Sequence, residues 1–271
     1  MTNKAIIIGY GNMGSVIADG IRAAGGQTTV VEKDPDRVAR AAKAGHEVAA
    51  SPEQADLEGA ATVLAVKPQD FLSMTDAYGL LFRDRPVISI MAGVPIALIS
   101  QVCYTSQVAR IMPNLAGAFG KAAVGLAFAE EAESEVRETA HTVAASLGSV
   151  TEVPESRIPA VTGVSGSGIA FVFSFIHGLA LGGTRAGIAY PKALDMALDV
   201  VEGAVVALRQ TGIHPSDYSS RVASPGGTTI EGLTALEERG FVGAVMEAVT
   251  RAAGRAAELE EELIERASGR G

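Results

Sequence analysis

A glycine-rich turn follows directly after a short apolar run near the start of the chain. Residues 5–8 read Ala-Ile-Ile-Ile, and residues 9–14 read Gly-Tyr-Gly-Asn-Met-Gly, the spacing Gly-x-Gly-x-x-Gly. Where this spacing joins a buried strand to a helix, the missing side chains let a dinucleotide pyrophosphate approach the backbone amides at the helix N-terminus. The motif therefore predicts a dinucleotide-binding domain; the alternative is a glycine turn with no ligand.

Short apolar runs alternate with amphipathic stretches through the first half of the chain. The runs predict strands at residues 5–8, 28–31, 48–50, 62–66, 87–91 and 108–112, and the stretches between them predict helices at 13–24, 36–44, 52–56, 69–82 and 95–102. The runs are almost continuous in valine, isoleucine and alanine, which is typical of parallel strands that helices cover on both faces. We therefore expect a doubly wound α/β domain.

The pattern changes in the second half. After an apolar run at 122–129, the sequence predicts a polar helix at 130–147 and a strand at 150–153, and residues beyond 156 have helical character. We expect two domains, a dinucleotide-binding domain at 1–155 and an all-helical domain at 156–271. Residues 158–184 contain no Asp, Glu, Lys or Arg and are long enough to span a bilayer. Their six glycines and symmetric arginine flanks favour instead a helix buried in a core or a subunit interface.

Charge and cysteine content narrow the possible functions. The 271 residues carry a net charge of −9, which repels nucleic-acid backbones and anionic membranes. The single cysteine, Cys103, cannot form an internal disulfide, and the four histidines lack metal-ligand spacing, so no metal site is expected. Because no charged leader with an apolar stretch precedes residue 5, we expect a cytoplasmic protein.

Two charged residues follow the second predicted strand, where the adenosine ribose of a dinucleotide binds. Glu32 lies 18 residues after Gly14 and can accept hydrogen bonds from ribose hydroxyls, which favours NADH, whereas the adjacent Lys33 could bind the 2′-phosphate of NADPH. The prediction is NADH or NADPH with a slight preference for NADH, and both charges could instead be solvated. Loops after the fourth, fifth and sixth strands reach the same sheet edge. The predicted cofactor-binding residues are Gly9, Gly11, Asn12, Met13, Gly14, Glu32, Lys33, Val66, Lys67, Pro68, Ala92, Gly93 and Asn114.

Two more glycine-rich loops lie in the second half. Residues 224–229 read Ser-Pro-Gly-Gly-Thr-Thr and precede a helical segment, so they present backbone amides and hydroxyls that suit a small carboxylate. A helix cap without a ligand is the alternative. Residues 164–168, Val-Ser-Gly-Ser-Gly, form a similar loop ahead of the uncharged helix.

Together these motifs resemble those of the pyrroline-5-carboxylate reductase family over nearly the whole chain. The matching segments are Gly-x-Gly-Asn-Met-Gly at 9–14, Ala-Val-Lys-Pro at 65–68, Ala-Gly-Val at 92–94, Arg110 with Met-Pro-Asn at 112–114, Gly-Val-Ser-Gly-Ser-Gly at 163–168, Ser-Pro-Gly-Gly-Thr-Thr-Ile at 224–230, Leu-Glu at 236–237 and Gly-Phe at 240–241. The resemblance implies a Rossmann-type N-terminal domain and an all-helical C-terminal dimerisation domain. It also implies hydride transfer from NAD(P)H to a cyclic imine carboxylate in proline biosynthesis, within a homodimer or a larger assembly of dimers.

The resemblance assigns roles in substrate binding to particular residues. Backbone amides of Gly227 and Thr228 would hold the substrate carboxylate, together with Ser167, and the hydroxyl of Thr229 would face the ring nitrogen as the catalytic group. A protonated cyclic imine is already an electrophile, so this chemistry needs little acid or base from the protein.

Several positions depart from the family pattern. Ile169, Phe171, His177, Leu181 and Ser220 stand where proline, tyrosine or acidic side chains are usual, which makes the uncharged helix more apolar. Other substrates therefore stay open: a substituted pyrroline or a piperideine carboxylate, or an acyclic imine or 2-ketoacid, although residues 169–181 lack the lysine that reduction of a ketoacid would require. A non-catalytic nucleotide-sensing homologue is a further alternative. His177 could donate a proton or could be a packed helix residue.

Overall fold

The computed structural model describes residues 4–269, and the contacts within the chain divide it into two compact units. Unit 1 comprises Met1–Ser167 together with Thr250–Gly271, and unit 2 comprises Gly168–Val249. Unit 1 thus includes residues 156–167 and the end of the last helix, which the predicted boundary between residues 155 and 156 places in the helical domain.

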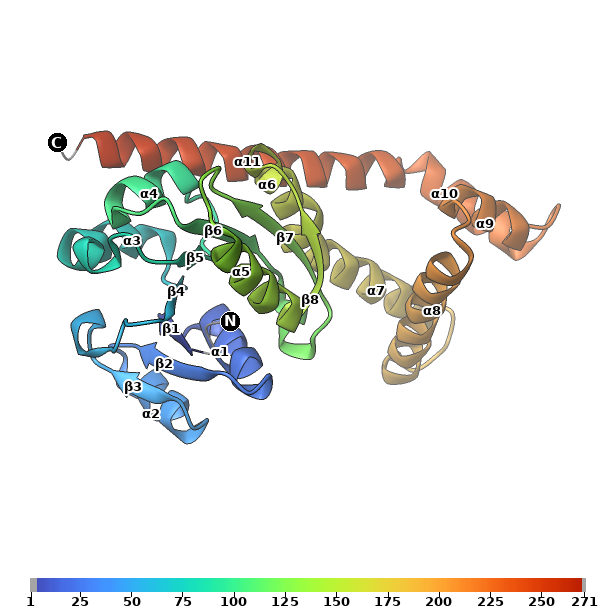
Figure 1. The fold of residues 1–271 in the computed structure, drawn as a ribbon. Helices are drawn as coiled ribbons and strands as arrows, with labels where there is room; N and C mark the ends of the chain where they lie inside the picture. Colours follow the sequence, from blue (N-terminus) through green and yellow to red (C-terminus); the bar gives the residue numbers. More distant parts are fainter. Residues whose placement is uncertain (1–3, 270–271) are drawn as a thin grey trace. The chain divides into compact units, whose positions relative to one another are not determined.

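An eight-stranded sheet forms the centre of unit 1, in the order β3-β2-β1-β4-β5-β6-β7-β8 (Figure 1). The first six strands are parallel, β7 runs antiparallel to β6, and β8 is parallel to β7. The strands are β1 Lys4–Ile8, β2 Gln27–Val31, β3 Glu47–Ala49, β4 Ala61–Leu64, β5 Val87–Ser89, β6 Val108–Met112, β7 Ala122–Phe128 and β8 Gly148–Glu152. The strand order 3-2-1-4-5-6 is that of dinucleotide-binding sheets, which confirms the predicted doubly wound fold.

Helices cover both faces of this sheet, as the apolar strands predict. Ile7 points into a core cluster with residues of α1, α2 and α5, and its neighbours Ile6 and Ile8 point into the opposite cluster with α3 and α4. The helices of unit 1 are α1 Asn12–Ala23, α2 Pro35–Lys43, α3 Pro68–Tyr78, α4 Ile96–Cys103, α5 Ser134–Leu147 and α6 Ile158–Val161, with short 3-10 turns at Pro52–Gln54, Gly79–Phe82, Leu115–Phe119 and Glu155–Arg157 and a π-helical turn at Thr162–Ser167. The predicted helix at 52–56 is therefore only a 3-10 turn, and the predicted helix at 130–147 begins at Ser134.

The C-terminal part of α11, Phe241–Ser268, packs on unit 1. Leu263 lies in the same core cluster as Met91 and Val94, and the carboxylate of Glu260 pairs with the buried Arg110 of β6 at 2.6 Å. This apolar and ionic contact is why the last helix is shared between the two units.

Unit 2 is entirely helical among the residues described. It contains α7 Gly168–Arg185, α8 Tyr190–Thr211, α9 Pro215–Val222, α10 Thr228–Glu238 and the first part of α11. Helices α7 and α8 meet where Gly183 faces Ala193: a Cβ atom at Gly183 would lie 3.0 Å from that of Ala193. The segment Glu155–Arg185 contains an 18-residue stretch that is apolar enough to cross a membrane, with mean hydropathy 1.7, and little of that stretch is buried within the single chain.

Candidate dinucleotide site

A cavity of about 1010 Å³ lies at the carboxyl ends of β1, β2, β4 and β5. Ligands bind at this edge of open α/β sheets, where the strand order reverses beside β1. Ten of the predicted cofactor residues line the cavity: Gly9, Gly11, Asn12, Met13, Glu32, Lys33, Val66, Lys67, Pro68 and Ala92. The structure therefore brings together residues from four separate loops of the sequence.

The glycine turn has the geometry that a pyrophosphate requires. A Cβ atom at Gly14 would lie 2.1 Å from the carbonyl oxygen of Gly9, and one at Gly9, whose φ is +99°, would lie 2.9 Å from that of Ala65. These two glycines are needed for the turn itself. Gly11 is different, because a Cβ there would have no atom within 4 Å and would point into open space at the N-cap of α1. The turn thus leaves room beside the positive end of a helix for a phosphate group.

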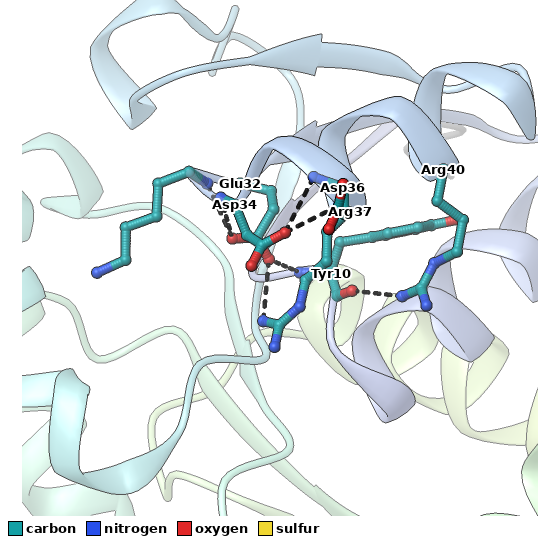
Figure 2. A network of polar contacts seen from close by, with 7 residues as sticks. Tyr10, Glu32, Asp34, Asp36, Arg37 and Arg40 are labelled. Atoms are coloured by element: carbon teal, nitrogen blue, oxygen red, sulfur yellow. Dashed lines mark hydrogen bonds and ion pairs between the residues drawn. The ribbon is translucent and has the colours of Figure 1, made fainter.

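Glu32 at the end of β2 is held by backbone amides (Figure 2). Its Oε2 accepts from the amide of Tyr10 at 2.8 Å, and its Oε1 accepts from the amides of Lys33 at 2.8 Å and Asp34 at 3.1 Å. Burial by itself raises the pKa of the Glu32 carboxyl, but these three amides and the nearby Arg37 outweigh burial and hold the pKa below its ordinary value. The carboxylate is therefore ionised where the cavity meets the end of β2.

Three cations that follow β2, Lys33, Arg37 and Arg40, line the same cavity. Arg37 lies 3.5 Å from Glu32 Oε2 and is partly exposed, and Arg40 donates to the carbonyl oxygen of Tyr10 at 2.8 Å. Asp34 fixes α2, on which both arginines lie, by accepting from the amides of Asp36 and Arg37 (Figure 2). Arg37 and Arg40 are not among the cofactor residues predicted from the sequence; their spacing of three residues on a helix after the acidic strand end was the available signal.

Tyr10, inside the glycine turn, is buried against polar side chains. Its hydroxyl donates to Asp19 at 3.2 Å, and Asp19 also lies 2.7 Å from Nε2 of the buried His46. Burial, reinforced by the charge of Asp19, raises the pKa of Tyr10 to about 12. The guanidinium of Arg40 lies over the Tyr10 ring, 5.1 Å from its centroid. The phenol of Tyr10 therefore stays neutral, and its contacts with Asp19 and Arg40 stabilise the glycine turn.

Three predicted cofactor residues do not line the cavity: Gly14, Gly93 and Asn114. Gly14 lies within the turn, and Gly93, with φ of +72°, packs against Leu259 of α11. The amide of Asn114 donates to the carbonyl oxygen and to the hydroxyl of Ser165, both at 3.2 Å, and its Oδ1 accepts from the amide of Ala116. Their contacts in the described chain are structural, and their cofactor roles stay predictions.

The predicted substrate residues fall in different units. Ser167 ends the π-helical turn of unit 1, and residues 227–229 lie at the start of α10 in unit 2. The amide of Gly227 is engaged in a turn, donating to the carbonyl oxygen of Ser224 at 3.0 Å. The amides of Thr228 and Thr229 begin the helix, where N–H groups lack partners within the helix. Of the predicted carboxylate donors, Thr228 is thus better placed than Gly227.

Comparison with known proteins covers both halves of the chain. Residues 155–259 match the family described as pyrroline-5-carboxylate reductase dimerisation, and residues 4–93 match the family described as NADP oxidoreductase coenzyme F420-dependent. The pyrroline-5-carboxylate reductase of Methanosarcina acetivorans is 37% identical over 269 residues, covering 96% of this chain and 99% of that protein.

Solved structures give the same result for the fold. A pyrroline-5-carboxylate reductase from Coxiella burnetii superposes with a TM-score of 0.85 at 27% identity, over 95% of this chain and 98% of that one. The pyrroline carboxylate reductase of Plasmodium falciparum, solved with NADP bound, has a TM-score of 0.84 at 24% identity, over 95% of this chain and 99% of that one.

Proposed function

Because the chain belongs to the pyrroline-5-carboxylate reductase family, we propose that it reduces 1-pyrroline-5-carboxylate to L-proline with NAD(P)H, a step of proline biosynthesis. It is an oxidoreductase that acts on a carbon–nitrogen bond. The observation that carries this proposal is the cavity of about 1010 Å³ against the glycine turn, in a chain that a family member matches over almost its full length.

Residues of unit 1 hold and orient the dinucleotide. The turn at Gly9, Gly11 and Gly14 receives the pyrophosphate, Glu32 receives the adenosine ribose, and the loops after β4 and β5 face the nicotinamide end. When bound, the reduced nicotinamide supplies the hydride for the carbon–nitrogen double bond. Val66, Lys67, Pro68 and Ala92 line that end of the cavity.

Residues of unit 2 hold the substrate. The first amides of α10, led by Thr228, bind the carboxylate with the help of the helix dipole, and the hydroxyl of Thr229 faces the ring nitrogen. Ser167 is a further proposed substrate-binding residue. A protonated imine needs alignment rather than a strong acid, which suits a site built of amides and hydroxyls.

We propose NADH as the preferred cofactor. A carboxylate offers about four acceptor positions, and backbone amides occupy three on Glu32, which leaves one for a ribose hydroxyl. Its negative charge repels a 2′-phosphate, whereas Lys33, Arg37 and Arg40 attract one. Measurement of kcat/KM with both cofactors should favour NADH, and Glu32→Gln should move the ratio toward NADPH. A wild type with the higher kcat/KM for NADPH would contradict this preference.

We propose a cytoplasmic homodimer in which residues 156–271 act as the dimerisation and substrate region, separate from a dinucleotide-binding region at 1–155. Large apolar side chains of unit 2 are exposed in the single chain, among them Phe173 at 57%, Val200 at 62% and Val242 at 62%. An apolar surface of this extent is covered by a partner in soluble proteins. A monomer in sedimentation at micromolar concentration would contradict the dimer.

The experiment that tests the reaction follows NADH and NADPH oxidation with 1-pyrroline-5-carboxylate and with 1-piperideine carboxylates. We expect the five-membered ring to be the better substrate. The six-membered ring is the second candidate, because His177, which lies 2.9 Å from the Tyr190 hydroxyl, stands on α7 where the family commonly has acidic side chains. A folded protein that binds cofactor but turns over no imine would reject both and favour a nucleotide sensor.

A further inference from the structure

The loop between β5 and α4, residues 90–95, contributes Ile90, Met91 and Ala92 to the cavity at the nicotinamide end. The loop is followed by Ile96, the first residue of α4. Pro95 occupies the N-cap and has no side-chain acceptor, so the first amides of α4 need an acceptor from elsewhere in the chain.

That acceptor is Glu155, distant in the sequence. Its Oε1 accepts from the amide of Ile96 at 2.6 Å, which places a carboxylate at the positive end of α4. The same oxygen accepts from Nη1 of Arg110 at 3.2 Å. Arg110 is almost fully buried on β6, and its other terminal nitrogen pairs with Glu260 of α11 at 2.6 Å. Arg110 thus links Glu155 to β6, which lies between β5 and β7 in the sheet.

A second contact fixes the same loop independently. Gly93 packs against Leu259, where an added Cβ atom would lie 3.1 Å from the Leu259 Cβ, and Val94 lies in the core cluster with Leu263. Leu259 precedes Glu260, so α11 contacts the loop directly and also contacts the arginine that holds its cap. Both sets of contacts converge on the five residues from Ala92 to Ile96.

We propose that Glu155 is a positioning residue for the reduction: by capping α4, it fixes the loop that lines the nicotinamide end of the cavity. This inference rests on the proposed function for its kinetic consequence. Glu155 acts through the Ile96 amide and is not among the residues that line the cavity. Its removal should therefore lower turnover while the adenosine end, held by Glu32 and the glycine turn, keeps its affinity for the dinucleotide.

Two conservative substitutions separate the effect of the side-chain length of Glu155 from the effect of its charge. Glu155→Gln keeps an oxygen at the position of Oε1, which makes both hydrogen bonds, but removes the charge. Glu155→Asp keeps the charge but draws the carboxylate back by one methylene from Ile96. Because small misplacements near a reacting centre slow catalysis strongly, we expect Glu155→Asp to lower kcat by about tenfold or more. Glu155→Gln should keep kcat within about twofold of wild type, because it rescues the cap.

The matched controls are Glu152→Asp and Glu152→Gln, at an exposed position three residues earlier that pairs with Arg137 rather than with the loop. Both should behave as wild type. The dissociation constant of NADH should stay within about twofold in all four variants. Equal loss of kcat in the two Glu155 variants, or a loss of kcat matched by an equal loss of NADH affinity, would overturn the proposal.

Hydrogen exchange gives a readout that does not need turnover. In Glu155→Asp, the amide of Ile96 should exchange faster by about 2- to 30-fold, the range that loss of a helix cap produces, and in Glu155→Gln it should stay protected. Unchanged exchange in Glu155→Asp would overturn the proposal. If the wild type reduced no cyclic imine, the proposed function would fail, and the exchange data would still decide whether Glu155 fixes this loop.

Discussion

Gly11 offers a test of the cofactor site in which stability and binding respond in opposite directions. In the described chain, a Cβ atom at Gly11 would meet nothing within 4 Å, and its φ of −74° is one that alanine adopts readily. Gly11→Ala should therefore fold as the wild type does. It should gain about 0.4–1 kcal/mol in the free energy of unfolding, because alanine reduces the entropy of the unfolded chain.

The same methyl group occupies the space in which a pyrophosphate would approach the first amides of α1. Overpacking of this kind costs about 1–3 kcal/mol, so NADH and NADPH should bind about 5- to 150-fold more weakly. Urea unfolding of the free protein measures the first effect, and fluorescence titration with each cofactor measures the second. If Gly11→Ala bound both cofactors as tightly as the wild type, the pyrophosphate would not lie at this turn, and the reasoning would be refuted.

Three further outcomes follow from the same structure. Gly14→Ala should lower the free energy of unfolding by about 1–3 kcal/mol, since its Cβ would lie 2.1 Å from the Gly9 carbonyl oxygen; urea unfolding at pH 7 checks this. Glu32 has a lowered pKa in the folded protein, so its contribution to stability is present above the ordinary carboxyl pKa and is lost as the pH falls through the folded value. The free energy of unfolding should therefore fall less between pH 7 and pH 4 in Glu32→Gln than in the wild type. An equal fall in both proteins would argue against a lowered pKa for Glu32. Thr229→Ala should lower kcat for the imine more than it changes cofactor affinity, and an unchanged kcat would remove Thr229 from the reaction.

The sheet could be predicted because its signal is local. The run at 108–112 is β6 with the same bounds, since continuous apolar residues are needed wherever helices cover both faces. The predicted strand at 62–66 extends too far, because Ala65 and Val66 leave the sheet to line the cavity. The direction of β7 was not predictable: an apolar run has the same composition in either direction. The short helix Pro215–Val222 lies in the region predicted to be helical, but its bounds were not predicted because its residues are mostly polar and lack a clear apolar period.

The part of the cofactor site that a sequence motif marks could be predicted. The part that depends on how helix α2 packs on the sheet could not. Glycine spacing identifies the turn, since only glycine permits the contacts at Gly9 and Gly14. Arg37 and Arg40 offer only their spacing of three residues on a helix, which is a weak signal because charged residues on a helix are usually solvated. They reach the cavity through the placement of α2, which Asp34 caps. A further signal was available and unused: Arg110 interrupts an apolar strand, and a buried guanidinium requires acidic partners elsewhere in the chain.

The acidic end of α11 illustrates the same reasoning over a longer range. Residues 258–262 read Glu-Leu-Glu-Glu-Glu, a composition typical of a solvated helix face. In the structure, Arg255 pairs with Glu258 and Glu262 on an exposed face, whereas Glu260 turns to the buried Arg110 and Leu259 to Gly93. Charge alone cannot distinguish these faces, because a helix presents adjacent residues in different directions. The pairing of Glu260 follows from β6, because the buried Arg110 on this strand is compatible with a stable fold only if carboxylates pair with it. Substitutions at Glu260 should therefore affect the loop beside the cofactor, and substitutions at Glu258 or Glu262 should not.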